Sequence, residues 1–165
     1  MVVIFSQITL IKMHNILKYI KITPLCFCAF IFIFATILDL MLYSWFDLNL
    51  YSFFIGLAMI ASGVYVFRSA IAEMAEYHTS YRYDQEPRTI LTTGPYQFSR
   101  NPIYLSYSLC LLGVGFFFAN LWIFFFYPFL FLWFNLVMID KEEVWLSDIF
   151  GEDYYQYKRL VRRWF

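Results

Sequence analysis

The longest uncharged stretch of the sequence covers 39 residues, from position 101 to position 139. A helix that crosses a bilayer needs about 20 predominantly apolar residues, so this stretch is long enough for two crossings. Asn120 lies at its midpoint, with 19 uncharged residues on either side. We therefore expect a helical hairpin over 102–139 that turns near Asn120 and returns to the membrane face from which it started.

Two further charge-poor segments precede this hairpin. The first covers 22–38 and extends to about 45 with Asp39 as its only charge, and the second covers the 20 residues 48–67. Each matches the length of one membrane span. Polar residues at helical spacing after Arg68 predict that the second span continues beyond the membrane to about Thr79. Small residues in this span allow a neighbouring helix to approach closely; they are Gly56, Ala58, Ala61, Ser62 and Gly63.

The segments outside the spans carry the polar residues. Pro87 and the run Thr92-Thr93-Gly94-Pro95 predict a loop over 79–101. Pro102 suits the first turn of the helix that follows, where its missing N–H is not needed. After the hairpin, Gly151 should divide two short helices. The second of these places aromatic residues opposite basic ones, a pattern that predicts a helix lying on the membrane surface.

The composition agrees with a membrane protein. Hydrophobic residues make up 62% of the chain and charged residues 15%, whereas in soluble domains roughly half of the residues are apolar and about 25% are charged. The sequence predicts an all-α, polytopic membrane protein with four principal transmembrane helices, a C-terminal helical hairpin and an interfacial tail helix. Its expected parts, within a single domain 1–165, are an N-terminal segment 1–21, spans one and two in 22–78, a cytosolic loop 79–101, the hairpin 102–139 and a cytosolic tail 140–165.

The basic residues indicate the orientation. In the four-span arrangement all 12 lysines and arginines lie on one side of the membrane, and short cytoplasmic segments are the ones that keep such residues. Both termini and the polar loop should therefore face the cytosol, across the inner membrane if the organism is bacterial. No small-residue cleavage site follows the first span, so we expect no removable signal peptide, and either Met1 or Met13 is the start. The zero net charge gives no reason to expect a nucleic acid as partner.

Folding the hairpin back brings its two polar ends together. Arg100, Asn101 and Tyr104 open it, and Glu142 and Glu143 follow its end. Ionisable groups at a membrane pocket are candidates for function, and this set can hold a zwitterionic, water-soluble ligand beside a lipid-dissolved one. The three cysteines do not have the spacing of metal ligands, so we expect no metal site.

The sequence around these polar ends resembles a known family. The stretch LTTGPYQFSRNPIYL at 91–105, the pair Glu142-Glu143, the segment 150–157 and the residues VRRWF at 161–165 are similar to the isoprenylcysteine carboxyl methyltransferase family and its phospholipid methyltransferase relatives. The resemblance covers about 88–165. It implies that S-adenosylmethionine binds between the loop, the first turn of the hairpin and the glutamates. Carried over by position, the cofactor contacts would be Leu91, Tyr96, Asn101, Pro102, Ile103, Tyr104 and Glu142.

The two glutamates should have different roles. Adjacent residues on a helix point about 100° apart, so one should contact the ligand while the other pairs with Arg100 or with an arginine of the tail. We assign Glu142 to the cofactor, and Arg100 and Glu143 to catalysis; the opposite order of the two glutamates stays open. Methyl transfer from a sulfonium depends on alignment and exclusion of water more than on a strong acid or base.

The resemblance implies an S-adenosylmethionine-dependent methyltransferase whose partners are membrane lipids and a lipophilic, amphiphilic or lipidated acceptor. Carboxyl O-methylation of an isoprenylcysteine-like substrate is favoured, and N-methylation of a phospholipid amine is the next alternative. The isoprenylcysteine enzymes place an arginine one turn before the glutamates, where this chain has Met138, Ile139 and Asp140. A scaffold without activity and a small transporter are further alternatives, although the near absence of charge in the spans argues against a transporter. The sequence leaves the oligomeric state open.

Overall fold

The computed structural model describes residues 23–42, 49–79 and 87–165. Three predicted features lie outside the described residues: the N-terminal segment 1–21, the turn between spans one and two, and the first part of the polar loop, 80–86. The described chain contains helices and no strands. In order they are α2 (Thr23–Leu42), α3 (Leu50–Glu76), the 3₁₀ turn η1 (Gly94–Gln97), α4 (Pro102–Phe117), α5 (Leu121–Trp133), the π-helical segment η2 (Phe134–Ile139), α6 (Asp140–Phe150) and α7 (Glu152–Leu160).

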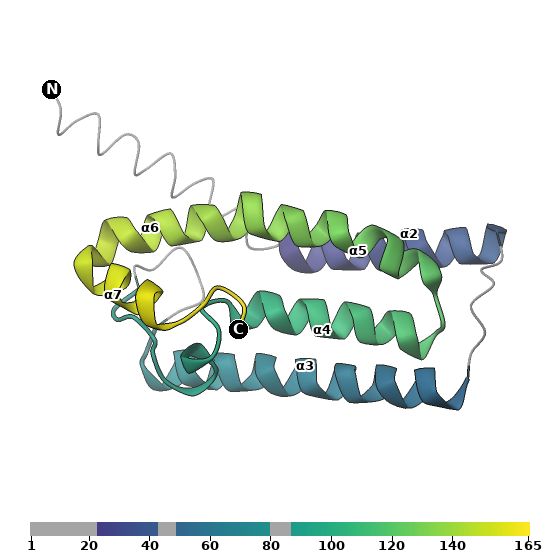
Figure 1. The fold of residues 1–165 in the computed structure, drawn as a ribbon, viewed down its shortest axis with the longest axis horizontal. Coiled ribbons are helices and arrows are strands. Elements are labelled where there is room, and N and C mark those ends of the chain that lie inside the picture. Colours follow the sequence, from purple (N-terminus) through teal and green to yellow (C-terminus); the bar gives the residue numbers. More distant parts are fainter. Residues whose placement is uncertain (1–22, 43–48, 80–86) are drawn as a thin grey trace, which may run out of the picture.

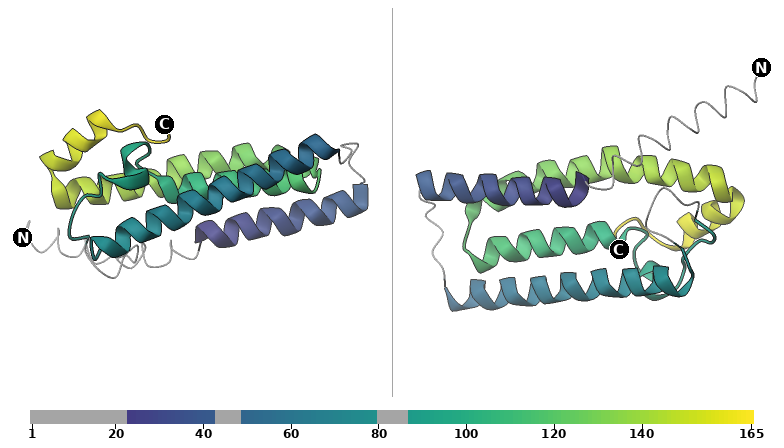
Figure 2. Two further views of the ribbon diagram at one scale, coloured as in Figure 1. Left: turned by 90° about the horizontal axis from the view of Figure 1, so that it is seen from below. Right: turned by 180° about the vertical axis from the view of Figure 1, so that it is seen from behind.

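The long helices lie side by side along the longest axis of the molecule (Figures 1 and 2). Three ranges, Pro24–Leu42, Leu50–Glu76 and Leu121–Phe150, are long and apolar enough to cross a membrane, and Pro102–Phe117 is a shorter apolar helix beside them. The predicted all-α, polytopic membrane fold is therefore confirmed. α3 also runs beyond the apolar range 48–67, as its polar second half predicts.

The hairpin turns where the sequence predicts it. α4 ends at Phe117, the backbone of Ala119 adopts a positive φ of 52°, and the side chain of Asn120 accepts a hydrogen bond of 3.3 Å from the backbone N–H of Ile123. Asn120 is thus the N-cap of α5, a position that favours asparagine because its side chain satisfies a free backbone donor. The two polar ends of the hairpin consequently meet at one end of the bundle.

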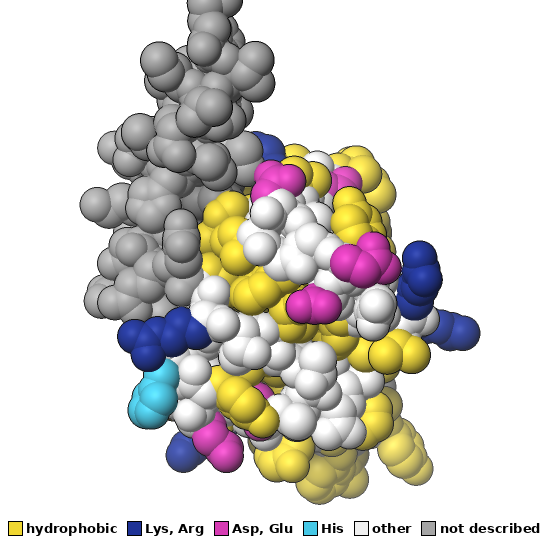
Figure 3. Space-filling model, turned by 90° about the vertical axis from the view of Figure 1, so that its left-hand side faces the viewer, with side chains coloured by type: hydrophobic (Ala, Val, Ile, Leu, Met, Phe, Trp, Pro, Cys, Tyr) yellow, Lys and Arg dark blue, Asp and Glu magenta, His cyan; other side chains and the backbone are white. Residues whose placement is uncertain are grey.

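The second arm of the hairpin does not stop where its apolar sequence ends. α5, η2 and α6 form one continuous rod from Leu121 to Phe150 (Figure 1). The carboxylates of α6 therefore stand on a direct extension of a membrane-crossing helix. Seen from this end, the molecule presents acidic and basic side chains separated by polar and apolar ones (Figure 3).

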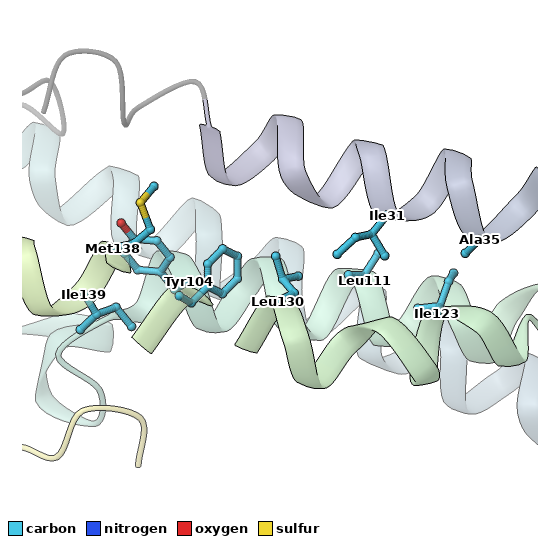
Figure 4. Close-up of a cluster of buried hydrophobic side chains, with 9 residues drawn as sticks. Ile31, Ala35, Tyr104, Leu111, Ile123, Leu130, Met138 and Ile139 are labelled. Atoms are coloured by element: carbon cyan, nitrogen blue, oxygen red, sulfur yellow. The ribbon is translucent and has the colours of Figure 1, made fainter. Parts of the chain in front are cut away.

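A core of apolar side chains fills the space between α2, α4 and the α5–η2 rod (Figure 4). Ile123, Leu130 and Phe134 are fully buried there, and Ile31 and Ala35 contribute from α2. By contrast, many large apolar side chains on the outside are exposed, such as those of Phe129 and Leu132. In a membrane protein such a surface faces lipid, which is as apolar as the core.

α3 and α4 approach each other closely through glycines. A Cβ atom added at Gly56 would lie 2.5 Å from the backbone nitrogen of Phe117, and one added at Gly113 would lie 2.9 Å from the carbonyl oxygen of Gly56. Gly63, two turns along α3, meets the same helix and is buried, whereas Ala58 is exposed. Of the small residues predicted to permit close packing, the two glycines are therefore the ones that do so.

Replacing Gly56 with valine should destabilise the bundle. The new side chain would overlap the backbone of α4, and overpacking of this kind costs about 1–3 kcal/mol. We expect a lower midpoint of thermal unfolding in detergent for Gly56→Val. The matched control is Ala58→Val on the exposed face of the same helix, which should unfold at the wild-type temperature. Equal midpoints for the two variants would contradict the packing described here.

Candidate functional site

A cavity lies at the polar end of the bundle, between the loop 87–101, the start of α4, and helices α6 and α7. Its lining contains Arg100 and every residue predicted to contact a cofactor, namely Leu91, Tyr96, Asn101, Pro102, Ile103, Tyr104 and Glu142. The structure therefore brings together eight of the nine predicted site residues around one space. The ninth, Glu143, lies outside the described lining.

The loop that forms one wall of the cavity packs against α3. The hydroxyl of Thr93 donates a hydrogen bond to the carboxylate of Glu73, and Gly94 follows with φ of 55°. A Cβ atom added to Gly94 would lie 2.6 Å from Glu73 Oε2, so a larger residue would require a strained backbone conformation and a shift of the Glu73 side chain. The short η1 turn then places Tyr96 in the cavity lining, within a small buried cluster against which Met74 of α3 packs.

The opposite wall joins the two ends of the hairpin. Pro102 occupies the first turn of α4, and in the same turn the hydroxyl of Tyr104 donates a hydrogen bond of 3.2 Å to Glu142 Oε2 of α6. The Tyr104 ring packs edge-on against Phe134, with 5.2 Å between the ring centroids. The predicted meeting of the α4 start and the α6 glutamates is thus confirmed by a direct contact.

Glu143 lies at the centre of an ionic cluster. Its side chain is only 7% exposed, and its carboxylate contacts Arg100 Nη2 at 3.2 Å, Arg163 Nη2 at 2.9 Å and Lys158 Nζ at 3.6 Å. Asp140 adds a second carboxylate, 2.8 Å from Arg163 Nη2. Hydrogen bonds to Glu143 raise the pKa of Arg163 above its ordinary value. The two glutamates therefore have different neighbours, as predicted: Glu142 lines the cavity, whereas Glu143 pairs with Arg100 and with Arg163 of the tail.

Two hydrogen-bond donors in the cavity wall are buried without a partner among the described residues. They are the Tyr96 hydroxyl and Arg100 Nε. An unsatisfied buried donor costs about 1–3 kcal/mol, so these two groups are available to bind a ligand that enters the cavity. Burial, followed by the charge of Glu142, raises the pKa of Tyr96 above its ordinary value. Tyr96 is therefore a neutral donor, and Arg100 adds a positive one.

Helix α7 contributes more to the site than its sequence indicates. Its pattern predicts a helix on the membrane surface, yet Tyr154 is 2% exposed and lines the cavity together with Tyr157. The Tyr157 hydroxyl donates a hydrogen bond of 2.8 Å to the carbonyl of Tyr96. Burial raises the pKa of both α7 tyrosines. The spacing of three between these tyrosines is the one sequence signal for their shared inward face.

The cavity combines chemically different surfaces. Glu142, Tyr96 and Arg100 offer an acceptor and two donors, while Pro24, Met74 and Leu146 provide apolar walls. Trp145 and Tyr107, like the two tyrosines of α7, are cavity residues that the sequence analysis does not identify. A ligand with a charged part and a flat or apolar part fits such a lining.

Comparison with known proteins identifies the family. The family model described as phospholipid methyltransferase matches residues 51–153, which is more than half of the chain and includes all nine predicted site residues. Neither a curated protein nor a solved structure matches the chain. Family membership implies methyltransferase activity in a membrane protein, and it does not distinguish the isoprenylcysteine enzymes from those that act on phospholipids. The chain belongs to the phospholipid methyltransferase family.

Proposed function

We propose that this protein is an S-adenosylmethionine-dependent membrane methyltransferase and that its donor binds in the cavity at the polar end of the bundle. Family membership supports the reaction class. The observation that carries the site is a pair of buried donors, the Tyr96 hydroxyl and Arg100 Nε, that have no partner within the described part of the chain and share a lining with the Glu142 carboxylate.

The residues present suit this donor. Glu142 can accept hydrogen bonds from an ammonium group or from ribose hydroxyls. Tyr96 can donate to a carboxylate, and aromatic faces such as that of Tyr104 can lie against adenine or the sulfonium. When bound, S-adenosylmethionine supplies an electrophilic methyl group on a positively charged sulfur. The residues that would hold it are Leu91, Tyr96, Asn101, Pro102, Ile103, Tyr104 and Glu142.

The protein's own contribution is positioning and exclusion of water. A methyl acceptor reacts by displacement in line with the bond that breaks, so the two reactants must be held in one orientation. The aromatic lining from α4, α6 and α7 keeps water away from such a reaction. The apolar walls at Pro24, Met74 and Leu146 give the lipophilic part of an acceptor a surface to bind.

The acceptor we favour carries a carboxylate on a lipophilic body, as an isoprenylcysteine-like substrate does. Glu143 already binds Nη2 of Arg100, whereas Nε has no partner among the described residues. Nε is therefore the atom through which Arg100 can hold such a carboxylate. In this proposal Arg100 is the catalytic group that contacts substrate. Glu143 acts through it, as a positioning residue.

N-methylation of a phospholipid amine is the second candidate. The phospholipid description of the family favours it. An amine must also lose a proton, and Glu142 is the cavity carboxylate that can receive it. A scaffold without activity would bind no donor.

Glu142→Gln should weaken binding of the methyl donor. Removing the charge from a charge-assisted hydrogen bond costs about 1.5–3 kcal/mol, which corresponds to a rise in Kd of roughly 10- to 100-fold. Calorimetric titration of the purified protein with S-adenosylmethionine measures this change. Glu152→Gln, which alters an exposed carboxylate at the start of α7, is the control and should bind as the wild type does. An unchanged Kd in Glu142→Gln would contradict its role in the site.

The methyl product should be an ester. Membranes that contain the wild-type protein, incubated with methyl-labelled S-adenosylmethionine and a lipid extract, should yield a labelled lipid that releases methanol in mild base. A label that resists base and resides on a lipid amine would contradict carboxyl methylation and support N-methylation. Absence of any labelled lipid, together with absence of donor binding, would support the scaffold.

Arg100→Lys should slow transfer without removing the ion pair to Glu143. Lysine keeps the positive charge but lacks the Nε donor, and loss of one hydrogen bond to a charged group corresponds to roughly a tenfold or greater fall in kcat/KM for the acceptor. Arg159→Lys, at an exposed position of α7, should leave kcat/KM unchanged. Equal rates for the two variants would argue that Arg100 does not contact the acceptor.

A further inference from the structure

The residues that follow α7, which we call the strap (161–165), cross back to the start of α4. Val161 has an extended backbone, which ends the helix. The N–H of Arg100 donates to the carbonyl of Arg162 at 3.1 Å. The Ser99 hydroxyl and the Asn101 side-chain amide both donate to the carbonyl of Arg163, at 3.1 and 3.2 Å. Two consecutive carbonyls of the strap therefore hold three consecutive residues at the edge of the cavity.

The side chain of Arg163 connects the strap to α6. Its Nε donates to Glu143 Oε1 at 3.1 Å and its Nη2 donates to Glu143 Oε2 at 2.9 Å, an arrangement with two parallel bonds. Such paired bonds fix the orientation of a carboxylate as well as its position. The same carboxylate contacts Arg100. Arg163 thus fixes Glu143, and Glu143 fixes Arg100.

Trp164 connects the strap to the membrane-crossing rod. Its indole N–H donates to Asn135 Oδ1 at 2.9 Å, and its ring lies against Phe131, with 4.9 Å between centroids. Asn135 belongs to η2 and Phe131 to α5. The strap is therefore attached to two parts of the chain that lie far apart in the sequence: the cavity loop, and the continuous rod formed by α5, η2 and α6.

We infer that the strap holds the donor cavity in its binding geometry and that Arg163 is the positioning residue for Arg100 and Asn101. Among the described residues that line the cavity, neither Arg163 nor Trp164 is present, so the strap acts through the residues it holds. The strap also lies beyond 51–153, the part of the chain that the family model matches. The test by donor binding rests on the proposed function. The test by amide hydrogen exchange does not, because it needs no donor.

Arg163→Met should weaken donor binding although Arg163 does not line the cavity. The substitution removes both bonds that orient the Glu143 carboxylate, so Arg100, which contacts the same carboxylate, is held less firmly in its orientation. We expect Kd for S-adenosylmethionine, measured by calorimetry on the full chain in detergent, to rise about tenfold, within the range found for substitutions that act through other residues. Arg163→Lys keeps the charge but not the paired geometry, so its Kd should fall between those of the wild type and Arg163→Met.

The neighbouring arginine provides the control. Arg162 is exposed, its guanidinium forms no ion pair within the described part of the chain, and its carbonyl is kept in any substitution. Arg162→Met should bind the donor with the wild-type Kd. A wild-type Kd in Arg163→Met, or equal losses in Arg162→Met and Arg163→Met, would overturn the inference.

A measurement without donor separates this inference from the proposed function. If the strap holds the cavity edge, the amide hydrogen of Arg100 should exchange faster with solvent in Arg163→Met than in Arg162→Met, with no ligand present. Equal exchange in the two variants would overturn the inference. If the wild-type protein bound no donor yet exchange at Arg100 accelerated only in Arg163→Met, the proposed donor site would fail and the positioning by the strap would stand.

Discussion

The buried carboxylate of Glu143 is the interaction on which the site depends. It forms ion pairs with side chains from three parts of the chain: Arg100 before α4, Lys158 on α7, and Arg163 after the end of α7. A buried carboxylate is unfavourable unless cations compensate its charge, and here three cations do so, which ties these three segments of the chain to one point. The cavity wall is the surface that this cluster holds in place.

The membrane explains why the cluster lies where it does. Lipid cannot satisfy backbone hydrogen bonds, so the chain crosses the membrane as helices. An uncharged stretch that is long enough for two crossings therefore folds back on itself as a hairpin. Charged groups are then left at the ends of the hairpin. Because α5, η2 and α6 form one rod, the carboxylates of α6 stand directly above the apolar core, where a water-soluble ligand and a lipid-dissolved ligand can meet.

Much of this arrangement follows from the sequence. The turn at Asn120, the first turn at Pro102 and the helix stop at Gly151 each use a residue with a strong local preference, and all three are confirmed. The convergence of Arg100 with the glutamates follows from the length of the uncharged stretch alone. Local preference and span length are properties of the sequence itself, so these features need no knowledge of the tertiary fold.

Other features depend on tertiary contacts and could not be read from the sequence. Which of two adjacent glutamates faces the cavity depends on the rotation of α6, and the apolar pattern before it does not fix that rotation. The inward face of Tyr154 depends on how α7 folds back after Gly151. The hydrogen bond between Thr93 and Glu73 joins residues twenty positions apart, and no sequence pattern around either residue predicts it.

The central claim is that both polar ends of the hairpin surround one donor molecule. Photo-crosslinking of the purified protein with an azido-adenine analogue of S-adenosylmethionine, followed by mapping of the labelled peptides, tests it most directly. The account predicts label in the segment 91–104 and also in the α6–α7 segment, with both labels lost together when excess S-adenosylmethionine competes. Label confined to other parts of the chain, or label that excess S-adenosylmethionine does not displace, would contradict it.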